Sequence, residues 1–108
     1  MKLSIIIPCK NEEGNVLELY NKIKDTLGKV KYEMIYIDDG STDGSSKLCD
    51  DLVVNDSRVH VYHNMNHGVS YSRNYGINKA HGDFIFFCDS DDYLDREIIQ
   101  KLVFHFQK

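Results

Sequence analysis

Residues 3–9 read LSIIIPC, a nearly unbroken apolar run that stops at Pro8 and Cys9. A strand with apolar residues on both faces is typical of a parallel sheet that is covered by helices on each side. The run therefore predicts a central, fully buried strand over residues 3–9. The rest of the chain is expected to supply the neighbouring strands and the helices that cover them.

Apolar periodicity further along the chain predicts three more strands that alternate with helices. The expected strands are Tyr32–Ile37, Arg58–His63 and Asp83–Cys88, and the expected helices are Glu12–Leu27, a short one marked by Leu48, Leu52 and Val53, Val69–Ala80, and one over Leu94–Phe106. Asn11 or Asn15 is expected to cap the first helix, and Gly28 is expected to end it. This alternation predicts an α/β three-layer sandwich around a mostly parallel, Rossmann-like sheet.

The size and composition of the chain are those of one domain. Its 108 residues are 42% hydrophobic and 28% charged, with 13 basic and 17 acidic residues and a formal net charge of −4. Basic residues form no cluster, so nucleic acid and anionic membranes are not expected as partners. The apolar runs are too short to span a bilayer, and the N-terminus does not have the pattern of a signal peptide. Three cysteines without Cys-x-x-Cys spacing favour a reducing, cytoplasmic setting over disulfides or zinc.

Acidic residues follow two of the predicted strands. Asp38 and Asp39 come after the second strand, and Asp89, Asp91 and Asp92 come after the fourth. Ligands of parallel α/β sheets bind beyond the carboxyl ends of the strands, where the strand order reverses. Two like charges about 4 Å apart repel by about 4 kcal/mol at an effective dielectric constant of 20, so a cation is expected to neutralise this group. Mg²⁺ and Mn²⁺ take such ligands and bridge them to phosphates.

A purely structural role remains open for these aspartates. Aspartates at strand-to-helix junctions also serve as helix N-caps, and Asp92 or Asp95 could do so for the last helix.

His63 and His67 are four residues apart, but they fall at a strand end and a turn, which does not favour a metal pair. The glycines form neither Gly-x-Gly-x-x-Gly nor Gly-x-x-x-x-Gly-Lys, so a bound diphosphate would need a metal ion to meet its charge.

Four segments follow one another at a spacing that matches a known family. They read SIIIPCKNEE (residues 4–13), YIDDGSTDGS (36–45), NHGVSYSRNYG (66–76) and AHGDFIFFCDSDDYL (80–94). In this order they resemble the donor-binding half of family 2 glycosyltransferases of the GT-A fold. The resemblance implies a GT-A nucleotide-diphospho-sugar transferase fold in which residues 1–108 form the donor-binding part of a truncated domain, with the acceptor-binding part absent.

The resemblance also implies an activity. It is the inverting, metal-dependent transfer of a sugar from a nucleoside diphosphate sugar, with a UDP-sugar as the first choice, to an acceptor hydroxyl. The 66–92 stretch is more similar to transferases of surface polysaccharide synthesis, whereas residues 11–14 are more similar to polyprenyl-phosphate sugar synthases. A sugar or a lipid-linked acceptor is the implied partner, and Mn²⁺ or Mg²⁺ is the implied cofactor.

Roles for single residues follow from the same resemblance. Asp39 would hydrogen-bond the nucleobase, Arg73 would approach the base and Asp39, and Asp89 would lie near the ribose and diphosphate. Asp91, assisted by Asp92, would coordinate the metal ion. The remaining donor-binding positions, which would line the base pocket, are Pro8, Cys9, Lys10 and Glu12.

Two departures from the family's pattern bear on these roles. Lys10 stands where the family often has an aromatic residue, so the base contact is expected to be weaker or ionic. The general base of the family lies well beyond the Asp-x-Asp motif, and no residue of this chain is assigned to it. The chain is therefore expected to lack the catalytic base.

Two other classes of protein fit parts of the pattern. A signalling receiver domain also gathers aspartates around Mg²⁺, but its acidic pair follows the first strand and it needs a fifth strand. A non-catalytic nucleotide-sugar-binding module would share the donor site and lack the transfer step. The apolar face of the last predicted helix, with Phe104 and Phe106, is expected to be covered by absent sequence or by a second copy in a dimer. The expected location is the cytoplasm, with absent segments holding the protein at the inner face of a membrane.

Overall fold

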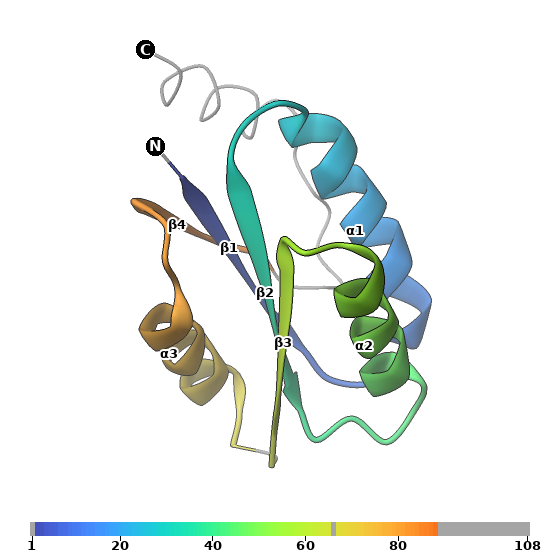
Figure 1. The fold of residues 1–108 in the computed structure, drawn as a ribbon. Helices are drawn as coiled ribbons and strands as arrows, with labels where there is room; N and C mark the ends of the chain where they lie inside the picture. Colours follow the sequence, from blue (N-terminus) through green and yellow to red (C-terminus); the bar gives the residue numbers. More distant parts are fainter. Residues whose placement is uncertain (1, 66, 89–108) are drawn as a thin grey trace.

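The computed structural model describes residues 2–65 and 67–88 of the chain. Within these residues, one four-stranded parallel sheet has the strand order β3-β2-β1-β4 (Figure 1). The elements in chain order are β1 (Leu3–Cys9), α1 (Glu13–Leu27), β2 (Tyr32–Asp39), α2 (Ser45–Asn55), β3 (Val59–Asn64), α3 (Val69–Lys79) and β4 (Phe84–Phe87). The predicted helix over residues 94–106 lies outside the described residues.

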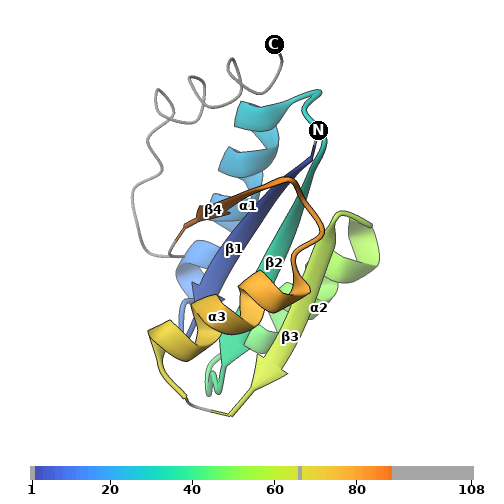
Figure 2. The same ribbon diagram turned by 90° about the vertical axis from the view of Figure 1, so that its left-hand side faces the viewer.

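The two central strands are buried along their whole length, as the apolar run predicts. Every residue of β1 and β2 is buried. Helices α1 and α2 cover one face of the sheet and α3 covers the other (Figures 1 and 2). Successive side chains of β1 therefore enter different layers: Ile5 and Ile7 join the larger core cluster, and Ile6 joins a smaller cluster with Tyr75 of α3. The predicted α/β three-layer arrangement is confirmed.

The strand order reverses between β1 and β4. The chain moves outward from β1 through β2 to β3, and α3 then returns it across the sheet to β4 on the other side of β1. Ligands of open α/β sheets bind at such a reversal, beyond the carboxyl ends of the strands. The strand order therefore places the expected ligand position beyond the carboxyl ends of β1 and β4.

The end of α1 agrees with the sequence prediction, but its beginning does not. Gly28 has a φ of 53°, and its N–H donates to the carbonyl of Lys24 at 3.2 Å, so glycine ends the helix as predicted. At the other end Glu12 precedes the helix, and neither Asn11 nor Asn15 caps it through a side chain. Asn15 lies inside the helix, and Asn11, with a φ of 53°, lies before it.

Gly76 lies where α3 contacts β1. A Cβ atom at this position would lie 2.5 Å from Cγ2 of Ile6, which is shorter than any stable carbon contact. Glycine is therefore tolerated inside α3 because it lets the helix lie directly on the sheet.

Gly76→Ala is expected to lower the free energy of unfolding by about 1–3 kcal/mol, because the added methyl group has to displace Ile6. Gly14→Ala is the matched control, because a Cβ there meets no atom within 4 Å. Alanine at position 14 of the chain, inside α1, is expected to be neutral or stabilising by up to about 1 kcal/mol. Urea unfolding of both variants measures the difference, and equal stabilities would contradict the close α3–β1 contact.

A buried carboxylate joins the strands at the opposite, amino edge of the sheet. Glu33 of β2 is 1% exposed, and its Oε2 accepts hydrogen bonds from Ser4 Oγ and from the backbone N–H of His81, both at 2.6 Å. The backbone N–H of Gly82 in turn donates to Ser4 Oγ at 2.8 Å. Burial raises the pKa of Glu33, but these hydrogen bonds and nearby Lys2 outweigh it, so its pKa lies below the ordinary value.

Glu33→Gln is expected to lower the free energy of unfolding by about 1–3 kcal/mol at neutral pH, because the amide cannot accept all of these hydrogen bonds. A carboxyl group with a lowered pKa stabilises the fold above its unfolded pKa, and this contribution is lost as the pH falls. The difference between the two proteins should therefore shrink below about pH 4. Glu18→Gln, at an exposed ion pair with Lys22, is the control and should change stability by less than about 0.5 kcal/mol.

Candidate functional site

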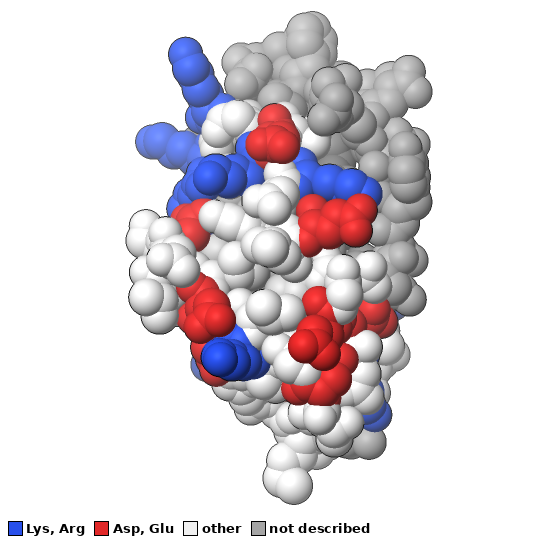
Figure 3. Space-filling model, turned by 90° about the vertical axis from the view of Figure 1, so that its right-hand side faces the viewer, with Lys and Arg blue, Asp and Glu red and all other residues white. Residues whose placement is uncertain are grey.

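The carboxyl ends of β1, β2 and β3 meet at one edge of the sheet. In the strand register Cys9 pairs with Asp38, Asp38 pairs with His63, and Asp39 pairs with Asn64. The segments that follow these strands therefore start side by side. Figure 3, which views the α1–α2 side, shows a group of acidic side chains on the lower half, where the strands end. Most basic side chains lie toward the other end, where further acidic side chains accompany them.

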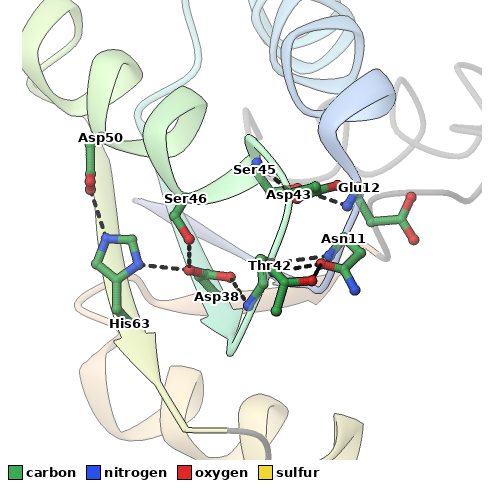
Figure 4. A network of polar contacts seen from close by, with 10 residues as sticks. Asn11, Glu12, Asp38, Thr42, Asp43, Ser45, Ser46, Asp50 and His63 are labelled. Carbon is green, nitrogen blue, oxygen red and sulfur yellow. Dashed lines mark hydrogen bonds and ion pairs between the residues drawn. The ribbon is translucent and has the colours of Figure 1, made fainter.

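Asp38 is the centre of a polar network at this edge (Figure 4). Its carboxylate accepts hydrogen bonds from the backbone N–H of Ser41 at 3.1 Å and from the hydroxyl of Ser46. Nδ1 of His63 lies 2.8 Å from the same carboxylate, and Nε2 of His63 lies 2.7 Å from Oδ1 of Asp50 on α2. The histidine ring is thus held between two carboxylates from different elements.

The environment of this network favours the charged forms of its members. Burial raises the pKa of Asp38, but hydrogen bonds from Ser41, Ser46 and His63 outweigh it, and the pKa lies below the ordinary aspartate value. Hydrogen bonds to Asp38 and Asp50 raise the pKa of His63 above the ordinary histidine value. Carboxylates at hydrogen-bond distance from both ring nitrogens thus favour the protonated form of His63.

The loop after β2 is tied to the segment after β1. Oδ1 of Asn11 accepts a hydrogen bond from the N–H of Thr42 at 2.8 Å, and the N–H of Asn11 donates to Ser41 Oγ at 3.0 Å. The N–H of Glu12, next to the start of α1, donates to Ser45 Oγ at 2.8 Å. Side chains from 30 or more residues away in the sequence thus satisfy the N–H groups just before α1. The side chain of Asn11 holds the loop after β2 instead of capping the helix.

Asp39 performs a different structural task from its neighbour. It is 4% exposed, and its two carboxylate oxygens accept hydrogen bonds from the backbone N–H groups of His67, at 2.7 Å, and Gly68, at 2.8 Å. Gly68 has a φ of 95° and directly precedes α3. A carboxylate can accept about four hydrogen bonds, so Asp39 has further acceptor capacity while it holds the loop before α3.

The two adjacent aspartates connect the two helical layers to the sheet. Consecutive residues of a strand point to opposite faces. Asp38 accordingly bonds Ser46 of α2 on one side, and Asp39 bonds the segment before α3 on the other. The sequence pattern indicated an acidic pair, but it did not reveal this division of roles or the part played by His63.

The predicted donor-binding residues at the end of β1 and just after it differ in exposure. Pro8 and Cys9 end β1 and are buried, and Cys9 belongs to the larger core cluster. Lys10 is exposed, while Glu12 is half-buried and accepts a hydrogen bond from Asn15 Nδ2 at 2.8 Å. The chain therefore leaves the core after Cys9, reaches the surface at Lys10 and is half-buried again at Glu12.

Arg73 belongs to the first half of α3 and is half-buried. Its guanidinium carbon lies 6.0 Å from the centre of the Phe87 ring, at the end of β4. The N–H of Cys88, the next residue, donates to the carbonyl of Ile6 at 3.0 Å, so the chain leaves β4 beside β1. The predicted ligands that follow, Asp89, Asp91 and Asp92, lie outside the described residues.

The structure also tests the possible His63–His67 metal pair and the expected absence of a membrane-spanning segment. Both ring nitrogens of His63 contact aspartates, whereas the ring of His67 lies 4.3 Å from that of Tyr71, so the two histidines do not converge. In the described part of the chain, no three histidine, cysteine or acidic residues are arranged to hold a metal ion. No helix within residues 2–65 and 67–88 has the length and apolar character to cross a membrane.

Comparison with solved structures defines the class of protein. The chain matches the crystal structure of Staphylococcus aureus TarS residues 1–349 with a TM-score of 0.81 and 28% identity, over 99% of this chain and 32% of that one. A Pyrobaculum calidifontis mannosyltransferase solved with GDP-Man and Mn²⁺ matches with a TM-score of 0.78, over 94% of this chain and 31% of that one. At 18% identity the latter supports the fold alone. The fold is that of GT-A glycosyltransferases, as predicted.

Sequence relatives define the family. The chain is 37% identical over 101 residues to the uncharacterized glycosyltransferase EpsJ of Bacillus subtilis strain 168, covering 93% of this chain and 29% of EpsJ. It is 36% identical over 102 residues to GlyG of Streptococcus pneumoniae serotype 4, covering 93% of this chain and 33% of GlyG. The profile of glycosyl transferase family 2 matches residues 4–108, and the chain belongs to this family. It spans about a third of the length of these relatives.

Asp39→Asn is expected to loosen the loop before α3. The amide nitrogen of asparagine would face a backbone N–H, and two donors cannot form a hydrogen bond with each other. Amide hydrogen exchange at residues 67 and 68 should accelerate by about tenfold or more, and the free energy of unfolding should fall by about 1–3 kcal/mol. Asp51→Asn, on the exposed side of α2, is the control and should leave both unchanged. Unchanged exchange at residues 67 and 68 in Asp39→Asn would contradict the anchoring role.

Proposed function

We propose that residues 1–108 form the donor-binding part of a glycosyltransferase that uses a nucleoside diphosphate sugar, with a UDP-sugar as the first choice. One observation carries the proposal: TarS residues 1–349, solved in complex with UDP-GlcNAc, match 99% of this chain with a TM-score of 0.80 and 27% identity. The same TarS segment was also solved with UDP. The chain spans about a third of the length of its relatives. The acceptor-binding part and the general base are therefore proposed to belong to the rest of the domain.

The proposed donor pocket lies at the carboxyl edge, between the segments after β1 and β2. Asp39 is proposed to accept a hydrogen bond from the nucleobase through a lone pair that the loop before α3 leaves unused. The pocket would be lined by the β1 end, from Pro8 and Cys9 to Lys10 and Glu12. Arg73 would approach the base from α3, and Asp89 would approach the ribose and diphosphate.

The proposed metal ligands are Asp91 and Asp92. β4 runs parallel to β1, and its last residue, Phe87, pairs with Ile6. The aspartates that follow in the sequence are proposed to approach the carboxyl edge, where Asp38 and Asp39 lie. Carboxylate oxygens suit Mg²⁺ and Mn²⁺. A bound divalent ion would neutralise the departing diphosphate as a Lewis acid. Two solved GT-A neighbours, the Pyrobaculum mannosyltransferase and a Mycobacterium tuberculosis glucosyl-3-phosphoglycerate synthase, contain Mn²⁺.

The transfer itself is proposed to be inverting, by direct displacement of the diphosphate by an acceptor hydroxyl. The acceptor class is proposed to be a surface polysaccharide or a glycolipid. In support, TarS is a poly(ribitol-phosphate) beta-N-acetylglucosaminyltransferase, to which the chain is 31% identical over 102 residues. A cytoplasmic location is proposed with this function, because nucleoside diphosphate sugars are made there.

Binding of UDP with Mg²⁺ or Mn²⁺ is expected to raise the thermal unfolding temperature of the chain, because a ligand that binds the native state alone stabilises it. At a ligand concentration of about 100 times Kd the gain is about 2.7 kcal/mol. A chelator should abolish the shift, and so should Asp91→Ala, whereas Asp25→Ala, an exposed carboxylate on α1, should keep it. A UDP shift that neither the chelator nor Asp91→Ala changes would contradict the metal assignment.

A further inference from the structure

We propose that His63 is a positioning residue for the donor nucleotide: its protonated ring, held between Asp38 and Asp50, fixes the loop after β2 and makes nucleotide-sugar affinity depend on pH. The inference rests on the proposed function, because it concerns the same pocket. No contact between His63 and the ligand is required, since the ring acts through Asp38 and the loop.

The distances define the protonation state that fits. Nδ1 of His63 lies 2.8 Å from Asp38 Oδ2, and Nε2 lies 2.7 Å from Asp50 Oδ1. A neutral imidazole carries one N–H, so it can donate to one of these carboxylates and must face the other with a lone pair. Only the imidazolium donates to both. The two distances therefore fit the protonated ring better than the neutral one.

Loss of the proton affects the two aspartates differently. The Asp50 side chain is 60% exposed and can turn toward water, whereas that of Asp38 is 3% exposed and cannot. Deprotonation therefore leaves Asp38 as a buried carboxylate without its positive partner. A neutral ring can still donate to Asp38 through Nδ1, but a hydrogen bond without the positive charge is weaker. Asp38 also accepts hydrogen bonds from Ser41 of the loop and Ser46 of α2, so a carboxylate that is held less firmly loosens the attachment of the loop.

That loop leads directly to the proposed pocket. Asp38 is followed by Asp39, the proposed base contact. Thr42 of the loop and Ser45, the first residue of α2, also form hydrogen bonds with Asn11 and Glu12, which follow Lys10 at the end of β1. The loop therefore links His63 to both sides of the pocket, and a shift in it changes the site without a contact to the ligand.

The charges around the ring set the direction of the pH effect. Among the described residues, the groups at ion-pair distance from His63 are Asp38 of β2 and Asp50 of α2. Their hydrogen bonds raise the pKa of His63, and partial burial lowers it by a smaller amount. With its side chain 43% exposed, the ring exchanges protons with solvent. Affinity is therefore highest below this pKa and falls as the pH rises through it.

Isothermal titration of the full chain with UDP-GlcNAc and Mg²⁺, from about pH 5.5 to about pH 8.5, tests the proposal. The diphosphate of UDP-GlcNAc is esterified on both sides, so the ligand itself does not titrate in this range. The affinity of the unmodified protein is expected to fall by roughly threefold to tenfold across the range. His63→Asn should bind weakly at every pH, whereas His63→Lys, which stays charged, should keep its affinity at high pH.

Two further variants separate this role from a general effect on the fold. Asp50→Asn removes one of the carboxylates that hold the proton, so the pH midpoint of the affinity loss should move to lower pH. His60→Asn is the matched control on the same strand, because His60 faces Glu33 at the amino edge, 3.5 Å from its Oε1, and should leave the profile unchanged.

The outcomes distinguish the two proposals. If the unmodified protein fails to bind UDP-GlcNAc at every pH, the proposed function is overturned and the inference with it. If binding occurs but is independent of pH, or if His63→Asn and Asp50→Asn both keep the original profile, the inference is overturned and the proposed function stands. If His63→Asn does not fold, as judged by circular dichroism, the midpoint shift of Asp50→Asn decides.

Discussion

The pairing of β1 with β2 is the constraint on which the rest of the structure depends. Seven residue pairs join the two strands in parallel register, from Leu3 with Tyr32 to Cys9 with Asp38, and every residue in both strands is buried. A strand pair with no exposed face needs helices on both sides, because apolar side chains point both ways. The register also fixes which residues meet at the carboxyl edge, so the core and the site have a common origin.

Polar chemistry is confined to the two ends of this buried pair. Glu33 lies near the start of β2, and Asp38 and Asp39 lie at its end, with apolar residues between them. Each carboxylate is matched by donors from other elements, as buried charge requires. At the amino edge the donors hold the α3–β4 connection, and at the carboxyl edge they hold the loops of the proposed donor pocket.

The fold could be predicted from local patterns, whereas much of the site could not. The strands, the helices and the parallel sheet of the described residues could be predicted from the LSIIIPC run, the alternating periodicity and Gly28. The contacts of His63 were not predictable in this way, because its partners lie 25 and 13 residues away in the sequence. Its spacing from His67 suggested only a metal pair. The roles of Asp89, Asp91 and Asp92 stay predictions from the family pattern.

The way α1 begins has a consequence for the order of folding. The N–H of Glu12 donates to the side chain of Ser45, 33 residues later in the sequence. The N–H of Glu13 donates to the side chain of Asp43, 30 residues later. Contacts between distant residues form late, because the loop between them must first be closed. The first turn of α1 therefore completes only after β2 has docked, and an isolated peptide of this helix would fray at its start.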